Sequence, residues 1–356
     1  MIDWVPKKNI NIDNINNKIF ECLENKNFTN NGKNVIELQK NIKNIFKIEN
    51  TKEILLTCNG SMGLNALVSG FNIYFNKKLK WIVQSFTFPS SVQGNLIESK
   101  IFDIDENMGP DINLLIKNKN DYDGIIITNC FGTSVNIELY ENFCTKNNKI
   151  LIFDNAASCF TTYKNKNHLN YGNGCIVSLH HTKPIGFGEG GFIIFDKNYL
   201  ESMEKAICFG YTKSNKYEYN IYANNYKMSE IACIYINEYL QNMNNIYNHH
   251  ISLIKYFIDK MKKYNLKIKL IKNFSKYDES LMSCIPILFE NKIGTDIFIE
   301  NKIEAKKYYF PLDSSCTISN KLFENIICLP LNIDIDENIV DYYINIIKKI
   351  LLLNNK

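Results

Sequence analysis

The sequence predicts an α/β fold, in which a large domain with a mostly parallel sheet covered by helices precedes a smaller C-terminal α+β domain. Three observations predict it. Between residues 53 and 208, short apolar runs alternate with stretches of helical spacing, which is typical of parallel strands buried on both faces. After about residue 264, short strands and helices follow without that regular order. The length of 356 residues is enough for two domains.

The large domain is expected to begin with helices and to continue as strand–helix units. The first fifty residues read as polar helical pieces, separated by the turn-like residues 29–32. Apolar runs predict strands at 53–58, 81–86, 100–105, 124–130, 149–154, 175–181 and 191–196. Helical spacing predicts helices at 64–75, 91–99, 137–147 and 199–208.

The second half of the chain is less regular. Residues 211–227 are polar and rich in Tyr, without periodicity, and they predict an ordered loop. An amphipathic helical segment is expected from 229 to about 264, with further helices at 294–302 and 337–353. We place the domain boundary near residue 240, so that residues 1–240 form the large domain with its N-terminal helical segment and 241–356 the small domain.

The charge balance favours neither a nucleic-acid nor a membrane partner. There are 41 basic and 37 acidic side chains, a net charge of +4, and the Lys residues are spread along the chain rather than clustered. No apolar run approaches the roughly 18–20 residues of a membrane span, and the first residues lack the apolar core of a signal peptide. We therefore expect a soluble, cytoplasmic protein.

The cysteines and histidines do not predict a metal site. Eleven Cys occur singly, without a C-x-x-C pair, so reduced and mostly buried thiols are expected rather than disulfides or a zinc ribbon. His180 and His181 are adjacent, and neighbours on a strand point to opposite faces. With no carboxylate at ligand spacing, packing or hydrogen bonding to a substrate is the better interpretation.

The sequence contains no arginine, so every basic residue is Lys. Arg is the side chain that grips a carboxylate or phosphate with two parallel hydrogen bonds. Any anionic group that this protein binds must therefore be held by Lys, by neutral side chains or by backbone N–H groups.

Ligands of open α/β sheets bind beyond the carboxyl ends of the strands, and the first such place is residues 58–63. The sequence there is Cys-Asn-Gly-Ser-Met-Gly, between an expected strand and an expected helix. Small residues leave backbone N–H groups open at a helix N-terminus, which is a phosphate site, and Ser61 adds a hydroxyl. No Gly-Lys-Ser/Thr follows, so it is not a P-loop. Taken alone, an ordinary capped turn is the better interpretation.

Two further residues follow predicted strands. Asp154 ends the run KILIFD, where its carboxylate could hold a protonated ring nitrogen, although a helix N-cap is an equally good interpretation. Phe88 follows the run WIVQSF and could stack on a flat ring. Core packing is the default for Phe88, because the chain has 22 Phe residues.

A third place combines Ser178 and Lys183 with the Gly-rich residues 186–191. A Lys that follows a buried strand can be desolvated enough to lower its pKa and act as a nucleophile. Ser178 could donate to the same phosphate. A solvated surface Lys is favoured by the number of Lys residues, but the unusual density of Gly directly after Lys183 weakens that alternative.

These motifs together resemble the DegT/StrS-type sugar-nucleotide aminotransferases, which belong to fold type I of the pyridoxal-phosphate enzymes. The resemblance covers nearly the whole chain, and its most specific element is Ser-x-His-x-x-Lys followed by Gly-Glu-Gly-Gly. The motifs occur in the family's order: TNNG (29–32), NGSMG (59–63), SFTFPSS (85–91), IFDID (101–105), FDNAA (153–157), SLHHTKP (178–184), GEGG (188–191), NNYKMSE (224–230), and YYFPL with ICLPL (308–331).

The resemblance implies a sheet of the seven-stranded type and a role for each motif residue. Lys183 would hold the cofactor covalently and then move protons, and Asp154 would pair with the pyridine nitrogen. The remaining cofactor contacts would be Phe88 on the ring, the phosphate cradle of Gly60, Ser61, Met62 and Ser178, and Asn225 reaching the phosphate of the neighbouring subunit. Substrate contacts would come from His181, Glu189 and Lys227.

The implied activity is transfer of an amino group from L-glutamate to a nucleotide-linked sugar. The cofactor would be pyridoxal 5'-phosphate, with pyridoxamine 5'-phosphate as the intermediate form, and the protein a homodimer with shared sites. By analogy with the family we favour UDP- or dTDP-4-keto-6-deoxy-D-glucose as acceptor, which gives a 4-amino sugar of the viosamine type for glycan biosynthesis. Nothing in the sequence separates C4 from C3 amination.

The sequence departs from the family at two positions. Ala157 stands where the family usually has Gln or His against the cofactor's phenolic oxygen, and Lys227 stands where Arg is usual. The family's dehydratases carry His at the lysine position, so Lys183 argues against that branch.

Three alternatives remain. The first is another fold-type-I reaction, such as 3-keto sugar amination, cysteine desulfuration or amino-acid transamination. The second is a non-catalytic regulator or scaffold, which Ala157 favours and the pair of Lys183 and Asp154 disfavours. The third, a plain nucleotide-binding module, lacks a Gly-x-Gly-x-x-Gly fingerprint.

Overall fold

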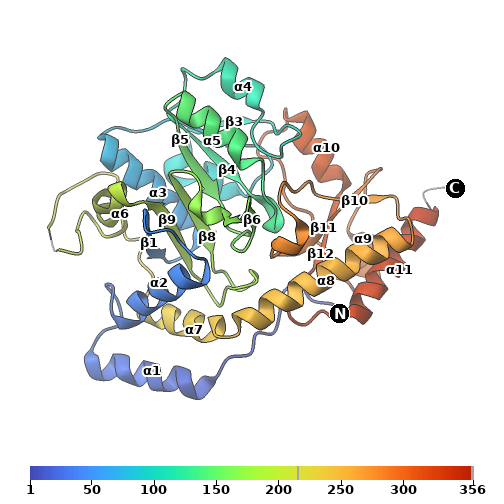
Figure 1. Cartoon of the computed structure of the whole chain (residues 1–356), viewed down its shortest axis with the longest axis horizontal. Helices are drawn as coiled ribbons and strands as arrows, with labels where there is room; N and C mark the ends of the chain where they lie inside the picture. The colour runs from blue at the N-terminus through green and yellow to red at the C-terminus, as the bar shows by residue number, and fades with distance from the viewer. Residues whose placement is uncertain (215, 354–356) are drawn as a thin grey trace.

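The computed structural model describes residues 1–214 and 216–353, which form a larger and a smaller part. The larger part contains a seven-stranded sheet between helices, and the smaller part a three-stranded sheet with helices beside it (Figure 1). This confirms the predicted fold class. Within the described residues, no helix combines the length and the apolar character that a membrane crossing requires.

The large sheet has the strand order β1-β9-β8-β5-β4-β2-β3. Its strands are β1 (Lys52–Thr57), β2 (Trp81–Gln84), β3 (Lys100–Phe102), β4 (Gly124–Thr128), β5 (Ile150–Asp154), β8 (Gly174–Ser178) and β9 (Gly191–Asp196). The pairs β3–β2, β2–β4, β4–β5 and β5–β8 are parallel, whereas β9 runs antiparallel to β8 and to β1. The sheet is therefore mostly parallel, as the sequence predicts.

Both faces of this sheet are covered. Successive residues of a strand point to opposite faces, and in β4 Ile125 and Ile127 join one hydrophobic core while Ile126 joins another. The first core includes side chains from α2 (Lys33–Ile45), α5 (Ile137–Lys146) and α7 (Glu230–Leu240). The second includes α3 (Gly60–Phe75) and α6 (Leu200–Ile207). This is why the strands read as continuous apolar runs.

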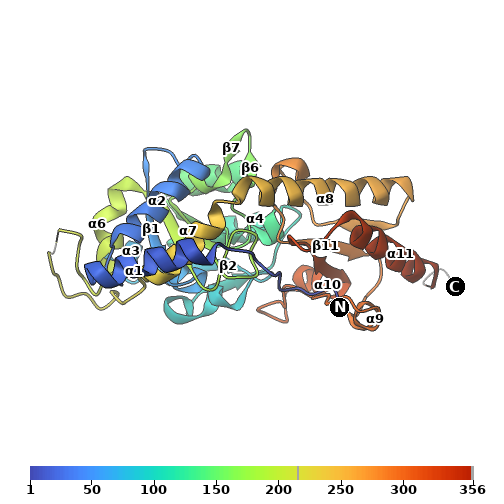
Figure 2. The same ribbon diagram turned by 90° about the horizontal axis from the view of Figure 1, so that it is seen from below.

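The N-terminal helix α1 (Ile12–Asn25) lies along the outside of the larger part and packs on α7 (Figure 2). Its N-terminus is capped by Asn11, whose side chain accepts hydrogen bonds from the N–H groups of Asp13 and Asn14. The predicted helical pieces before residue 50 are α1 and α2.

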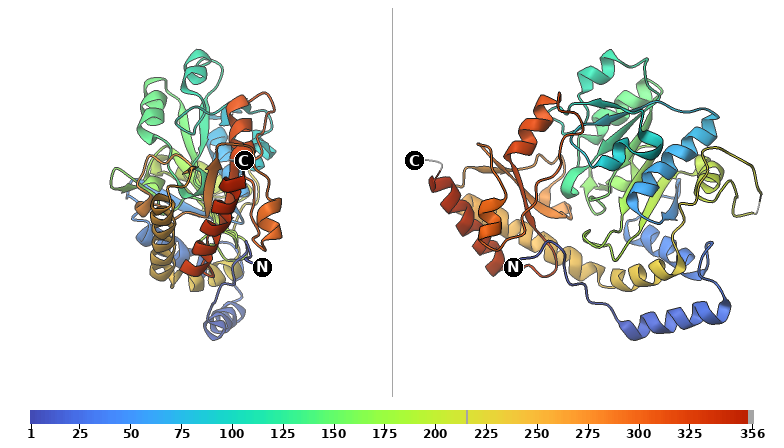
Figure 3. Two further views of the ribbon diagram at one scale, coloured as in Figure 1. Left: turned by 90° about the vertical axis from the view of Figure 1, so that its right-hand side faces the viewer. Right: turned by 180° about the vertical axis from the view of Figure 1, so that it is seen from behind.

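The smaller part is built on an antiparallel sheet of β10 (Ile268–Leu270), β11 (Cys284–Phe289) and β12 (Ile326–Pro330). The helices α8 (Met243–Lys263) and α11 (Glu337–Leu353) pack on each other over a core of its own, with α9 (Asp296–Glu300) and α10 (Thr317–Asn325) completing it. Figure 3 shows α8 crossing from the larger part to the smaller. Because α8 buries Ile246 in the first core of the large sheet and Phe257 in the core of the smaller part, the boundary near residue 240 stays a proposal.

The structure differs from the prediction in several elements. The helix predicted at 91–99 is absent, and two 3-10 turns, Pro89–Val92 and Gly94–Leu96, lie there with Gln93 in an extended conformation between them. The segment 229–264 is two helices, α7 and α8, and the strand predicted to reach residue 181 ends at Ser178. Elements that the sequence analysis missed are α4 (Ile112–Lys117), β6 (Thr162–Tyr163), β7 (Lys166–Asn167), α10 and β12.

Candidate active site

Five strands of the large sheet end at one edge with a polar residue. They are β1, β2, β4, β5 and β8, which end at Thr57, Gln84, Thr128, Asp154 and Ser178. The register places Thr128 opposite Asp154, and it places both Thr57 and Ser178 opposite Gly191. The side chains expected at the carboxyl ends of the strands therefore meet at a single edge.

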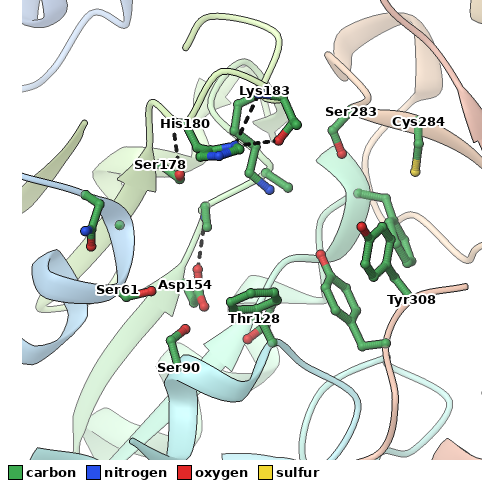
Figure 4. A pocket seen from close by; sticks show the side chains of 18 of the residues that line it. Ser61, Ser90, Thr128, Asp154, Ser178, His180, Lys183, Ser283, Cys284 and Tyr308 are labelled. Carbon is green, nitrogen blue, oxygen red and sulfur yellow. Dashed lines mark hydrogen bonds between the residues drawn. The ribbon is translucent and has the colours of Figure 1, made fainter. Parts of the chain in front are cut away.

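A cavity of about 530 Å³ lies at this edge, between the large sheet and the smaller part. In Figure 4, Ser61, Asp154 and Ser178 line one side, and Ser283, Cys284 and Tyr308 line the opposite side. The cavity is large enough for a small-molecule ligand of cofactor size.

Asp154 is the buried carboxylate of the cavity, with 2% of its surface exposed. Its Oδ1 accepts a hydrogen bond from the Ala156 N–H at 3.0 Å. Burial raises the pKa of Asp154, and the Ala156 N–H and the Lys183 ammonium oppose this shift. A cationic partner within the cavity would therefore hold Asp154 in its charged form.

Lys183 lies in the turn after β8 and lines the same cavity. Burial lowers its pKa, and the Asp154 carboxylate is the largest opposing influence. Among the described residues, its Nζ has neither a hydrogen bond nor an ion pair within the usual distances. A lysine with a lowered pKa and an unengaged amine can act as a nucleophile and as a proton carrier.

The start of α3 lines the end of the cavity that faces away from the smaller part. Asn59 caps this helix, and its side chain accepts from the Met62 N–H at 2.9 Å. Gly60, Ser61 and Ser178 line the cavity. A Cβ at Gly60 would lie only 3.0 Å from the Ser178 Cβ, so the absence of a side chain lets the helix start meet β8. Backbone N–H groups and two hydroxyls together suit a phosphate group.

Only some of the other predicted site residues line the cavity. Phe88 and Glu189 line the cavity, and Phe88 is 51% exposed there. Met62 does not line it, and its N–H is already bonded to Asn59. Ala157 is buried in the cavity wall.

Three predicted residues lie away from the cavity of this one chain. His181 does not line it, and its Nε2 lies 3.1 Å from the Pro6 carbonyl. The side chains of Asn225 and Lys227 join each other, with Lys227 Nζ donating to Asn225 Oδ1 at 2.7 Å. Lys227 forms an isolated bridge with Thr57, so this pair lies beside the end of β1. His180 rather than His181 lines the cavity, with its Nε2 3.5 Å from Glu189 Oε1.

The sequence analysis did not identify the cavity wall that lies across from Asp154, Ser178 and Ser61. Besides Ser283 and Cys284, this wall includes Trp4, Glu304, Lys306, Tyr308 and Tyr309. Lys306 Nζ pairs with Glu304 Oε1 at 2.7 Å, and Glu304 Oε2 accepts the Trp4 N–H at 2.7 Å. The only signal for this wall is the YYFPL motif at 308–312, because Trp4 and Lys306 are separated by about three hundred residues of sequence.

The site has no features of a metal centre. Within residues 1–214 and 216–353, no group of three or more His, Cys, Asp or Glu side chains could hold a metal ion. The cavity's chemistry therefore consists of a nucleophilic amine, a buried carboxylate and a helix start.

Comparison with known proteins agrees with this geometry. The sequence pattern of the DegT/DnrJ/EryC1/StrS aminotransferase family matches residues 9–348. A curated relative, UDP-4-amino-4,6-dideoxy-N-acetyl-beta-L-altrosamine transaminase of Campylobacter jejuni, is 30% identical over 122 residues. That match spans about a third of each protein, 33% of this chain and 32% of the relative.

Solved structures resemble the whole chain. Helicobacter pylori PseC, an aminotransferase involved in the biosynthesis of pseudoaminic acid, superposes with a TM-score of 0.80 at 17% identity over 98% of both chains. The E. coli GDP-4-keto-6-deoxy-D-mannose-3-dehydratase superposes with a TM-score of 0.79 at 17% identity, over 98% of this chain and all of that one (100%). At these identities the likeness establishes the shared fold.

Proposed function

The chain belongs to the DegT/DnrJ/EryC1/StrS aminotransferase family, and from this premise we propose that it transfers an amino group from L-glutamate to a ketone on a nucleotide-linked sugar. The observation that carries the proposal is the convergence of Lys183, Asp154 and the start of α3 on one cavity. In that reaction the donor takes up one water and becomes 2-oxoglutarate, and the ketone oxygen of the sugar leaves as one water, so that no net water is formed.

The cofactor of the family is pyridoxal 5'-phosphate, and the residues of the cavity fit it. The Gly60–Ser61 turn and Ser178 would hold the phosphate, and Asp154 would lie at the pyridine nitrogen. Phe88 would contact the ring. When bound, pyridoxal phosphate supplies an aldehyde that accepts the amino group and a ring that takes up the electron pair of a broken C–H bond. Asp154 favours a protonated ring nitrogen because its buried carboxylate needs a cationic partner.

Lys183 performs the proton transfers in this proposal. Burial lowers the pKa of its amine, which makes the neutral form that a general base requires easier to reach. The same amine would hold the cofactor covalently between turnovers. Because the sequence has no Arg, the anionic groups of both substrates must meet Lys side chains, hydroxyls or backbone N–H groups. Lys306 is an ammonium on the opposite wall that can serve in this way.

For the acceptor we propose a 4-keto-6-deoxyhexose joined to UDP or dTDP, aminated at C4 to a viosamine-type sugar. The name of the Campylobacter relative supports this choice, because it describes a UDP-linked 4-amino-4,6-dideoxy sugar. The dehydratase branch is disfavoured, since that branch carries His where this chain has Lys183.

The test is product analysis. We expect that the purified protein with L-glutamate and UDP- or dTDP-4-keto-6-deoxy-D-glucose gives equal amounts of 2-oxoglutarate and an amino sugar, whose NMR spectrum places nitrogen at C4. Nitrogen at C3 would contradict the proposed acceptor while leaving amino transfer intact. Failure to release 2-oxoglutarate with any keto sugar would contradict the aminotransferase itself and favour the scaffold alternative.

We also propose that the protein is a homodimer with shared sites. Asn225 is exposed on the single chain and does not line its cavity, so it is available to a neighbouring subunit. Large apolar side chains are exposed on the same loop, at Phe209, Tyr211, Tyr217, Tyr219 and Ile221. Exposed aromatic groups of this kind are typical of an interface between subunits.

Subunit complementation tests the sharing. Lys183→Ala and Asn225→Asp chains, each expected to be inactive as a homodimer, are co-expressed with different tags and purified through both. One site of such a heterodimer has both Lys183 and Asn225 intact, so we expect roughly half of the wild-type activity. A heterodimer as inactive as its parents would contradict a site shared through Asn225.

A further inference from the structure

The N-terminal segment, residues 2–8, runs from the smaller part to the loop that carries Lys183. At one end Ile2 forms a parallel bridge with Ile303, and the Trp4 N–H donates to Glu304. At the other end Pro6 accepts from His181 Nε2 at 3.1 Å. Figures 1 and 2 show the start of the chain beside the smaller part before it reaches α1.

Lys8 makes the closest contacts of this segment with the loop. Its Nζ donates to the backbone carbonyl of Lys183 at 2.6 Å and also to the carbonyl of Gly186. The same Nζ lies 4.6 Å from the ring centroid of Tyr239 in α7. One ammonium therefore holds both ends of the turn 183–186 and fixes it against α7.

Lys8 is an unusual lysine in this chain. It is only 8% exposed, and none of the ion pairs among the described residues includes it. Burial lowers the pKa of its ammonium to about 7. A buried cation without a carboxylate is costly, so its place is explained by the two carbonyls and the aromatic ring that it contacts.

The turn has little freedom to move independently of these contacts. The Gly186 N–H donates to the Lys183 carbonyl at 3.1 Å, and the Lys183 N–H donates to the His180 carbonyl at 2.8 Å. A Cβ on Gly186 would lie 2.0 Å from the His180 carbonyl oxygen, so the turn is pressed against the preceding backbone. A displacement of the carbonyls that Lys8 holds would move the backbone from which the Lys183 side chain extends.

We propose that Lys8 is a positioning residue that aims Lys183 into the cavity by holding the carbonyl groups of its turn. The proposal rests on the proposed role of Lys183 in amino transfer. Lys8 itself does not line the cavity, and it acts only through the backbone of the turn.

Hydrogen exchange and single-turnover kinetics test the proposal together. Lys8→Met removes the donors and keeps most of the apolar stem. In the purified full-length protein we expect amides of residues 183–190 to exchange about tenfold faster or more. We also expect the first half-reaction with L-glutamate, followed by the cofactor's visible absorption, to slow about 10- to 100-fold, as for a reacting group displaced by about 1 Å. The KM for L-glutamate should stay near that of the wild type.

Lys149 provides the matched control. Its Nζ also donates to a backbone carbonyl, that of Tyr122, at 2.6 Å, and lies 4.9 Å from the Tyr122 ring centroid. It does not line the cavity. Lys149→Met should therefore alter exchange only around its own contacts and leave the half-reaction unchanged. Lys8→Arg, whose guanidinium keeps N–H donors, should restore protection of the turn and much of the rate. Lys8→Gln, which removes the charge and shortens the side chain, replaces Lys8→Met as the loss variant if Lys8→Met does not fold.

The outcomes separate this proposal from the function on which it rests. Unchanged exchange at 183–190 in Lys8→Met, or a rate loss equal to that of Lys149→Met, would overturn the positioning role. A wild-type protein that does not react with L-glutamate would instead contradict the proposed function, while the exchange result would still decide whether Lys8 anchors the turn.

Discussion

Lys183→Ala is expected to reduce amino transfer by about 10⁴-fold or more, because it removes both the covalent attachment of the cofactor and the proton carrier. Proton transfer by a positioned side chain alone contributes typically about 10²- to 10⁴-fold. The measurements are the steady-state rate with L-glutamate and the keto sugar, and the visible absorption of the purified variant. We expect bound cofactor to be lost on dialysis from the variant and retained by the wild type.

This loss should not come from unfolding. Among the described residues, Lys183 Nζ makes no hydrogen bond or ion pair, and burial lowers its pKa, so its truncation removes no polar contact. The melting temperature of the cofactor-free variant should therefore equal or exceed that of the cofactor-free wild type. Lys183→Arg keeps a cation that stays protonated, and it should be as inactive as Lys183→Ala. A variant at position 183 with more than a tenth of wild-type activity would contradict the assignment.

The sequence was sufficient to find the strand-end half of the site. Each residue there lies at the end of a short apolar run, as Asp154 ends β5 and Ser178 ends β8. The pattern of a strand buried on both faces is local, and the parallel arrangement brings the carboxyl ends to one edge without further information. Lys183 could be located in the same way, because it comes shortly after a buried strand and directly before a Gly-rich loop.

The opposite wall could not be found in this way. Trp4 and Lys306 meet only because the N-terminal segment adds to the smaller part at Ile303, and no local pattern carries such a contact. Lys8 is one of 41 lysines, and its burial depends on packing against α7 and the turn at 183. Similarly, residues 91–99 have helical spacing, but Asn95 is bound instead to the side chains of Asn65 and Ser69 in α3, and tertiary contacts override the local preference.

Asp154→Asn is expected to lower the rate of amino transfer by about 10²- to 10⁴-fold, the range lost when a charged or proton-transferring group of an active site is removed. The substitution keeps the shape of the side chain and an oxygen that can accept from the Ala156 N–H. It removes only the charge that would keep the pyridine nitrogen protonated. The measurement is the single-turnover rate with L-glutamate under saturating cofactor, with Asp154→Glu as the variant that keeps the charge.

The same substitution should stabilise the cofactor-free protein. This direction of the change in stability distinguishes a functional carboxylate from a structural one. Burial raises the pKa of Asp154 in the folded protein above its ordinary value. Between these two pKa values the folded protein binds more protons than the unfolded chain, so stability falls as the pH rises through that window and stays lower above it. Removing the charge relieves this cost at pH 7 and above. At a pH below the ordinary pKa of the carboxyl group, the two proteins should melt alike.

Asp154→Asn should therefore melt at a higher temperature than the cofactor-free wild type at neutral pH while being far less active. A variant that loses both stability and activity at neutral pH would instead identify Asp154 as a helix-cap or packing residue whose charge the fold itself requires.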